Sequence, residues 1–221
     1  MNRMHALRLV FMVVLVGVLV AGRLGWMGGF AGRAGVTHGT AGESSGSSGV
    51  SEEQAAGRAH AVTGAPLTAI SGRFTDAAGA SRTLAELRGQ PFVASMLYTR
   101  CTTVCPRVVA QLQRLERDAG DPRPRFVLFS LDPAHDTPAT LRAFAETHGL
   151  DPGRWTLLVS DAAALPPLAA ALGVAWQGGA DGGIAHSAVI AVVDSAGRVR
   201  ERRVGLGTEP GVLLADWRAV R

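Results

Sequence analysis

Apolar and polar residues follow strand-like and helix-like periods along most of the chain. Two nearly continuous apolar runs of strand length, Pro91–Tyr98 and Arg125–Leu131, are typical of strands covered on both faces. Between them, apolar residues and both cysteines recur at steps of four, three, four and three, which is the spacing of one buried helix face: Cys101, Cys105, Val108, Leu112 and Leu115. Strand, helix and strand therefore predict a right-handed parallel unit.

Turn and capping signals predict the remaining elements. Thr137 followed by Pro138 begins a helix that Gly149 ends, and Asp194–Gly197 is the turn of a hairpin. Further strands are expected at 67–70, 72–75, 155–159, 187–193 and 198–204, and further helices at 163–172 and 210–220. A parallel unit followed by a hairpin and a last helix indicates the α/β class, with a thioredoxin-like domain whose central mixed sheet is flanked by helices.

The first residues have a different pattern. Arg8 precedes an apolar run, Leu9–Ala21, of the kind found in export signals and membrane anchors. As a helix the run measures about 20 Å, short of a hydrocarbon core of about 30 Å, but Trp26 and Phe30 continue its apolar character. We expect residues 1–31 to be a single-pass membrane anchor, with a cleaved export signal as the alternative.

The segment that follows has the composition of a linker. Residues 32–64 are rich in Gly, Ser and Ala, which predicts a flexible tether. Residues 65–221 are then expected to form the folded domain, on the periplasmic or other extracytoplasmic side of the cell membrane. Such a compartment permits a disulfide.

The charge of the chain argues against a nucleic-acid partner. The net charge is +4 and all 22 basic residues are arginine. From Thr63 onward, however, there are 17 arginines and 15 acidic residues. The charge of the predicted domain is therefore nearly balanced, without the excess of positive charge that nucleic-acid binding requires.

Cys101 and Cys105 are the only cysteines of the chain and the best candidates for its chemistry. Their spacing at the beginning of a helix places both sulfurs on one face, close enough to share a metal ion or to form a disulfide. They follow the first buried strand, at the edge where open α/β sheets place their sites. His186, after the glycine-rich segment 178–183, is the candidate third participant, on a loop that we expect to be pliable.

Several uses of these residues remain open from the residues alone. Two thiolates and an imidazole suit copper or zinc rather than calcium or magnesium. The cysteines could instead form a structural disulfide or a redox pair without metal, and His186 could be an ordinary histidine at a strand entrance.

Three motifs together resemble the Sco/SenC family. They are Tyr98–Pro106 with both cysteines, Ser130–Pro138, and Asp181–Ser187 with His186. The members of this family are thioredoxin-like proteins tied to copper handling during cytochrome c oxidase assembly. The resemblance spans roughly residues 66–205, and the motifs occur in the family's order.

The resemblance implies copper, as Cu(I) or Cu(II), bound by Cys101, Cys105 and His186. It implies a metallochaperone, without enzymatic turnover, that delivers copper to, or prepares, the dinuclear copper centre of a respiratory cytochrome c oxidase. Its partners would be a copper donor protein and the accepting oxidase subunit. The alternative is a thiol-disulfide oxidoreductase that uses Cys101 and Cys105 as a redox pair to reduce the acceptor's cysteines. A peroxidase is a third possibility without independent support.

One departure from the family concerns the residues between the cysteines. Many members carry an acidic residue there, whereas this chain has Thr102, Thr103 and Val104. The three implied ligands are unaffected.

The other residues near these motifs are expected to have structural roles. Asp132 and Asp136 are expected to tie the loop to the following helix, His135 to lie on the surface, and Tyr98 to lie in the core or at its rim. The arginines of the last hairpin are expected to form a solvated face: Arg198, Arg200, Arg202 and Arg203.

Overall fold

The computed structural model describes residues 64–179 and 183–221. The predicted anchor, 1–31, and all but the last residue of the predicted tether, 32–64, lie outside the described residues. Among the helices of the described ranges, none is long and apolar enough to cross a membrane.

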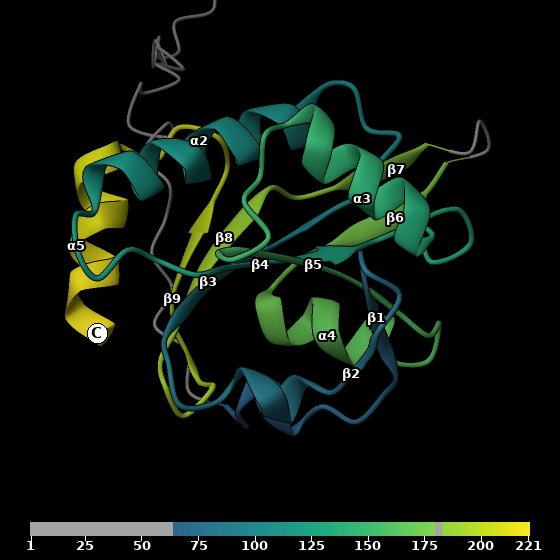
Figure 1. Ribbon diagram of the computed structural model, residues 1–221, viewed down its shortest axis with the longest axis horizontal. Coiled ribbons are helices and arrows are strands. Elements are labelled where there is room, and N and C mark those ends of the chain that lie inside the picture. Colours follow the sequence, from purple (N-terminus) through teal and green to yellow (C-terminus); the bar gives the residue numbers. More distant parts are fainter. Residues whose placement is uncertain (1–63, 180–182) are drawn as a thin grey trace, which may run out of the picture. The chain divides into compact units, whose positions relative to one another are not determined.

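A seven-stranded mixed sheet forms the centre of the domain (Figure 1). Its strands are β1 (Phe74–Asp76), β2 (Ser81–Arg82), β3 (Phe92–Leu97), β4 (Phe126–Ser130), β5 (Trp155–Ser160), β8 (Val189–Val193) and β9 (Val199–Val204). They lie in the order β2-β1-β5-β4-β3-β8-β9. A separate two-stranded sheet pairs β6 (Trp176–Gly178) with β7 (Ile184–His186).

The predicted parallel unit is confirmed. β3 and β4 are parallel, with Val93 opposite Phe126, and α2 (Val104–Asp118) connects them. β5 continues the parallel set beside β4, whereas β8 runs antiparallel to β3. The beginning of β8 therefore lies at the edge of the sheet where β3 ends.

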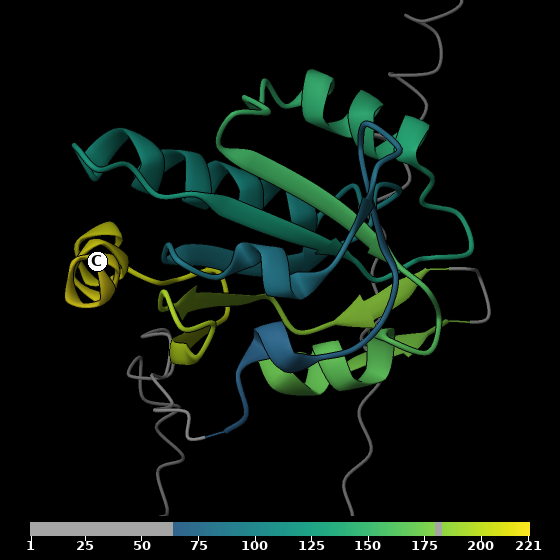
Figure 2. The same cartoon turned by 60° about the horizontal axis from the view of Figure 1, so that its bottom comes forward.

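Helices cover both faces of the sheet (Figures 1 and 2). On one face, α2, α3 (Pro138–Thr147) and α5 (Pro210–Val220) pack against Val93 and Leu97 of β3. On the other face, α4 (Leu165–Leu172) packs against the alternate side chains of β3, which include Phe92 and Met96. Burial on both faces explains why β3 and β4 read as continuous apolar runs.

The caps of α3 confirm its predicted limits. The Thr137 hydroxyl accepts from the Thr140 backbone N–H, Pro138 occupies the first turn, and Gly149 adopts a positive φ of 62° after the last turn. Each feature satisfies or removes a backbone group that a helix end leaves unpaired.

The prediction of a strand at 67–70 is wrong. Leu67–Ala69 is a 3-10 helix, η2, in which the Ile70 N–H donates to the Leu67 carbonyl. The Leu67 N–H donates instead to the Gly197 carbonyl in the β8–β9 turn, at 2.7 Å. This contact binds the segment to a turn and not to a strand ladder. A second 3-10 helix, η3 (Leu84–Leu87), was not predicted.

The predicted solvated arginine face is only half correct. Arg198 and Arg200 are exposed, but the Arg203 side chain is 13% exposed and donates two hydrogen bonds of 2.7 Å to Asp216 of α5. Arg202 donates to the Ala171 carbonyl at 2.6 Å. α5 and the end of α4 therefore cover part of β9, although the charge pattern predicted that its arginines would be exposed to solvent.

Candidate metal centre

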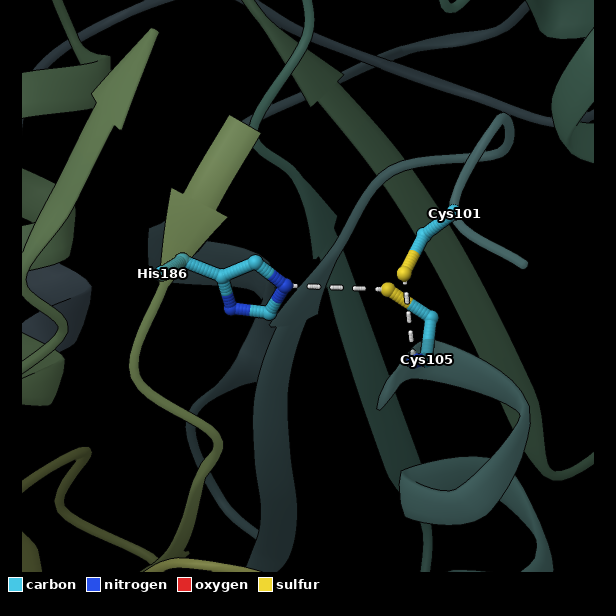
Figure 3. A group of neighbouring side chains, drawn as sticks. All are labelled: Cys101, Cys105 and His186. Carbon is cyan, nitrogen blue, oxygen red and sulfur yellow. Dashed lines mark hydrogen bonds between the residues drawn. The ribbon is translucent and has the colours of Figure 1, made fainter. Parts of the chain in front are cut away.

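The candidate site lies where β3 ends, α2 begins and β7 leads toward β8 (Figure 3). Cys101 lies in the loop after β3, and Cys105 in the first turn of α2. His186 is the last residue of β7. Because β8 begins at the edge where β3 ends, residues far apart in sequence meet here.

The two cysteines have different surroundings. The helical stripe was expected to include both, but α2 begins only at Val104, so Cys101 precedes the helix. Both are free thiols; Cys101 is 7% exposed and Cys105 is fully buried. The backbone N–H of Cys105 donates to the Cys101 sulfur at 3.3 Å, which places this sulfur at the N-terminal end of the helix.

These surroundings separate the pKa values of the two thiols. Burial alone raises the pKa of Cys101, but hydrogen bonds from Cys105 and from the backbone of Thr103 and Val104 outweigh it and lower the pKa from 9.0 to about 7. Burial raises the pKa of Cys105, and the neighbouring Cys101 sulfur raises it further. At neutral pH about half of Cys101 is therefore thiolate, whereas Cys105 is a thiol until a metal or another partner takes its proton.

His186 presents one ring nitrogen to the sulfurs. Its Nδ1 lies 3.1 Å from the Ser187 carbonyl, and this contact assigns the proton to Nδ1. The free lone pair of Nε2 then faces the Cys105 sulfur at 3.7 Å (Figure 3). Burial lowers the pKa of His186, which keeps the imidazole neutral, the form that ligates metals.

His186 lies on a short strand and not on the expected loop, whereas the pliability of this segment stays a prediction. His186 pairs with Trp176 across the β6–β7 ladder, so it is held by strand pairing. Gly178 is the last residue of β6 and pairs with Ile184, the Gly179 N–H donates to the Gly183 carbonyl, and residues 180–182 lie outside the described residues.

Together the three side chains form a compact ligand group. The sulfurs of Cys101 and Cys105 and a ring nitrogen of His186 lie within 4.8 Å of one another. Within the described part of the chain, no further histidine, cysteine or acidic side chain joins this group. Three soft or borderline ligands suit copper, whereas a structural zinc site usually has four protein ligands.

A buried carboxylate braces the loop that carries Cys101. Asp136, 2% exposed, accepts hydrogen bonds of 2.6 Å from the Thr99 hydroxyl and the Ser130 hydroxyl. It therefore ties the segment after β3 to the end of β4. Backbone hydrogen bonds make the expected tie between the loop and the helix start as well: the Thr99 N–H donates to the Asp136 carboxylate at 3.3 Å, and the Asp136 N–H donates to the Asp132 carbonyl at 2.8 Å, just before α3.

A second cluster lies at the rim of the site. Arg100 donates to Asp132 at 2.7 Å, and Nδ1 of His135 lies 2.7 Å from the same carboxylate. Burial by itself raises the pKa of Asp132, but the hydrogen bonds from His135 and Arg100 outweigh it and hold the pKa below its usual value. The His135 side chain is 56% exposed, which agrees with its predicted place on the surface.

Tyr98 packs against both apolar clusters of the domain, as its predicted place in the core or at its rim requires, and it also contacts the candidate site. Its ring meets the His186 ring edge-on, with centroids 5.9 Å apart and an interplanar angle of 76°. Burial raises the pKa of Tyr98, as do its contacts with the two cysteine sulfurs. Its place three residues before Cys101 is the one signal that could have identified it.

Comparison with known proteins agrees with this geometry. The family model SCO1/SenC matches residues 62–219. A SCO1 protein homolog of Bacillus subtilis is 31% identical over 87 residues, which cover 38% of this chain. The match spans only 45% of that relative.

Two solved structures of similar proteins cover most of the domain. A SCO1/SenC family lipoprotein of Bacillus anthracis is 25% identical, with a TM-score of 0.61 over 72% of this chain and 99% of that one. ScoI of Bradyrhizobium japonicum, solved with copper bound, is 26% identical, with a TM-score of 0.55 over 72% of this chain and 100% of that one. The fold, the ligand group and the match over residues 62–219 lead to one conclusion: the chain belongs to the SCO1/SenC family.

Proposed function

We propose that this protein is a copper metallochaperone that delivers copper to, or prepares, the dinuclear copper centre of a respiratory cytochrome c oxidase. The observation that carries the proposal is the convergence of two sulfurs and one imidazole nitrogen within 4.8 Å. Similarity to ScoI of B. japonicum, which has been solved with copper bound, supports the choice of metal.

The ligand group suits a protein that both takes up and releases copper. Two thiolates are sufficient for Cu(I), and the imidazole of His186 completes a set that also accommodates Cu(II). The thiolate character of Cys101 lets this sulfur bind first, and metal binding then displaces the proton of Cys105. His186 comes from a different sheet than the one that leads into the cysteine loop, so the third ligand can leave without disturbing the other two.

The expected location and partners form part of the same proposal. A membrane anchor at 1–31 and a tether at 32–64 would hold the domain on the extracytoplasmic side, close to an integral oxidase subunit. The copper donor would be a second protein of the same compartment. Thr102 and Thr103 are exposed between the cysteines, so a partner would meet hydroxyls there and not a carboxylate.

A second candidate function rests on the contrast between the two thiols. A nucleophilic Cys101 with a buried, protonated Cys105 behind it is the arrangement of a dithiol that attacks and then resolves a mixed disulfide. In this function the protein would reduce the cysteines of the acceptor site.

His186 separates the two functions, because dithiol exchange does not need it. The test is an anaerobic Cu(I) competition titration, followed by a Cu(II) titration, of the full-length protein in mild detergent. His186→Ala is compared with the parent and with the control His148→Ala, whose ring lies against Phe144 on α3. We expect His186→Ala to weaken Cu(II) binding by a factor of about 100 or more, and the control to match the parent.

Two outcomes would contradict the copper proposal. Unchanged affinity for both ions in His186→Ala would remove this residue as a ligand. Absence of copper binding in the parent, with dithiol reduction of a model disulfide intact, would leave the oxidoreductase function.

A further inference from the structure

Ser187, the residue after His186, departs from the regular hydrogen-bond pattern of the β6–β7 ladder. The two strands are antiparallel, with Trp176 opposite His186, so Ala175 and Ser187 form the next pair along the ladder. The Ser187 N–H donates to the Ala175 carbonyl at 2.9 Å. In a regular antiparallel ladder such a pair exchanges two hydrogen bonds, and the Ala175 N–H would donate back to the Ser187 carbonyl.

The returning hydrogen bond goes to the serine side chain instead. The Ala175 N–H donates to the Ser187 hydroxyl oxygen at 3.0 Å. The Ser187 carbonyl lies 3.1 Å from Nδ1 of His186 and accepts from it. The hydroxyl therefore takes the place of the carbonyl in the ladder, and the carbonyl becomes the acceptor for the imidazole.

This change of partners determines which imidazole nitrogen is available to a metal. A carbonyl oxygen can only accept a hydrogen bond, so it keeps the proton on Nδ1 and leaves the lone pair on Nε2. Nε2 faces the Cys105 sulfur at 3.7 Å (Figure 3). If Nε2 carried the proton, the same ring would present an N–H to the sulfurs, and an N–H cannot ligate a metal.

We propose that Ser187 is a positioning residue. By accepting the Ala175 N–H, its hydroxyl releases the Ser187 carbonyl to fix the tautomer and the orientation of His186, and this strengthens Cu(II) binding. The inference rests on the proposed copper function. Its effect is selective, because Cu(I) is satisfied by the two sulfurs whereas Cu(II) needs the imidazole in place. The hydroxyl acts through His186 and is not itself a ligand.

The test is Ser187→Ala in the full-length protein, which removes the hydroxyl and keeps the backbone. The Ala175 N–H then competes with Nδ1 of His186 for the Ser187 carbonyl. We expect the Cu(II) dissociation constant to rise by a factor of about 10, as for other groups that orient a metal ligand. The Cu(I) constant should change by less than a factor of about 3. A Ser187→Ala protein with the parent's Cu(II) affinity would overturn the inference, while the copper function would stand.

Two further variants are controls. Ser187→Thr keeps a hydroxyl on the same carbon and should bind Cu(II) within a factor of about 2 of the parent. Ser195→Ala removes an exposed serine side chain from the β8–β9 turn, at the edge of the sheet where β3 begins, and should match the parent. Equal losses of Cu(II) affinity in Ser187→Ala and Ser187→Thr would overturn the role of the hydroxyl.

A measurement without metal distinguishes failure of this inference from failure of the copper proposal. At about pH 8 an ordinary imidazole is neutral, and ¹⁵N NMR spectra report which ring nitrogen carries the proton. We expect His186 of the metal-free parent to carry it on Nδ1, and His186 of Ser187→Ala to be a mixture of both tautomers. If the parent binds no copper while the tautomers still change, the copper function fails and the role of Ser187 at His186 stands.

The same spectra can contradict the inference. Unchanged tautomers in Ser187→Ala would overturn it even if Cu(II) binding weakened, since the loss would then arise elsewhere in the hairpin. If Ser187→Ala fails to fold, the parent alone remains decisive, because a His186 ring with its proton on Nε2 would overturn the inference without any variant.

A double-variant cycle tests whether the hydroxyl acts through His186. In the His186→Ala background, Ser187→Ala should lower the Cu(II) affinity by less than a further factor of about 2, because both changes act through the same ligand. Additive losses would show that the hydroxyl supports the site by another route, and would overturn the inference.

Discussion

The sulfur of Cys101 accepts a hydrogen bond from the backbone N–H of Cys105 across 3.3 Å. The first turn of α2 thus stabilises the thiolate of a residue that lies just before the helix, while the second cysteine is buried in the apolar interior beneath it. The two thiols are unequal because of where the helix begins.

This inequality predicts selective alkylation of the reduced, metal-free protein. Because the pKa of Cys101 is about 7, its rate of reaction with iodoacetamide should rise with pH and reach half its maximum near pH 7, whereas an ordinary thiol does so near pH 8.5. Cys105 should remain unmodified over this range. The measurement is peptide mass spectrometry at timed intervals, with urea-unfolded protein as the control in which both cysteines react alike. Equal modification of both cysteines in the folded protein would contradict the assignment.

Loss of the Asp136 carboxylate should loosen the cysteine loop. Asp136→Asn weakens the hydrogen bonds from Thr99 and Ser130 in a buried place, so we expect the free energy of unfolding to fall by about 1–3 kcal/mol and copper affinity to fall as well. Urea denaturation and the Cu(I) competition titration measure the two effects. Asp118→Asn, which removes one member of an exposed pair with Arg114, should change stability by less than about 0.5 kcal/mol. A stable Asp136→Asn protein would show that the tie between the strand ends is unimportant.

Two glycines with similar backbone angles should respond differently to alanine. Gly197 has a φ of 80° and Gly79 a φ of 86°, so both substitutions carry the cost of about 1–2 kcal/mol for a left-handed conformation. A Cβ at Gly197 would also overlap the Thr68 side chain, whereas a Cβ at Gly79 would meet nothing within 4 Å. We therefore expect Gly197→Ala to destabilise the fold by at least about 1 kcal/mol more than Gly79→Ala. Equal losses in urea denaturation would mean that η2 moves away from the turn without cost.

The pair between Arg203 and Asp216 should be sensitive to removal of one partner. Its side chains are only 13% and 10% exposed, so Asp216→Asn leaves a guanidinium poorly compensated and should lower the free energy of unfolding by about 3 kcal/mol. The double variant Arg203→Met, Asp216→Leu should recover a large part of this loss, because no charge then remains buried. Urea denaturation of the single and double variants measures both values. A double variant less stable than Asp216→Asn would show that the pair contributes more than charge compensation.

The parts of the fold that the sequence could predict are those in which one local pattern determines the outcome. Continuous burial identifies β3 and β4, and the Thr137–Pro138 cap marks the beginning of α3. The strand predicted at 67–70 fails because the Leu67 N–H donates to a turn far downstream in sequence, at Gly197, while the Ile70 N–H donates within the segment, to the Leu67 carbonyl. Local propensity contains no information about such a contact.

The candidate site shows the same division. The identities of Cys101, Cys105 and His186 follow from motifs, and the structure brings them together. The difference between the two thiols depends on hydrogen bonds that form only when α2 begins at Val104. The contact of Tyr98 with His186 depends on the pairing of β6 with β7, short strands whose glycine-rich surroundings indicate a loop.

The small β6–β7 sheet also makes the third ligand exchangeable. The hairpin has its own ladder, and only Ser187 and Ala188 connect β7 to β8 along the chain. The pairing of Val189 in the central sheet therefore does not determine which residues the hairpin must contain. A thioether or a carboxylate could stand at position 186 while the scaffold beneath stays the same. The short β6–β7 sheet thus determines the identity of the third ligand, while the central sheet that supports it does not change.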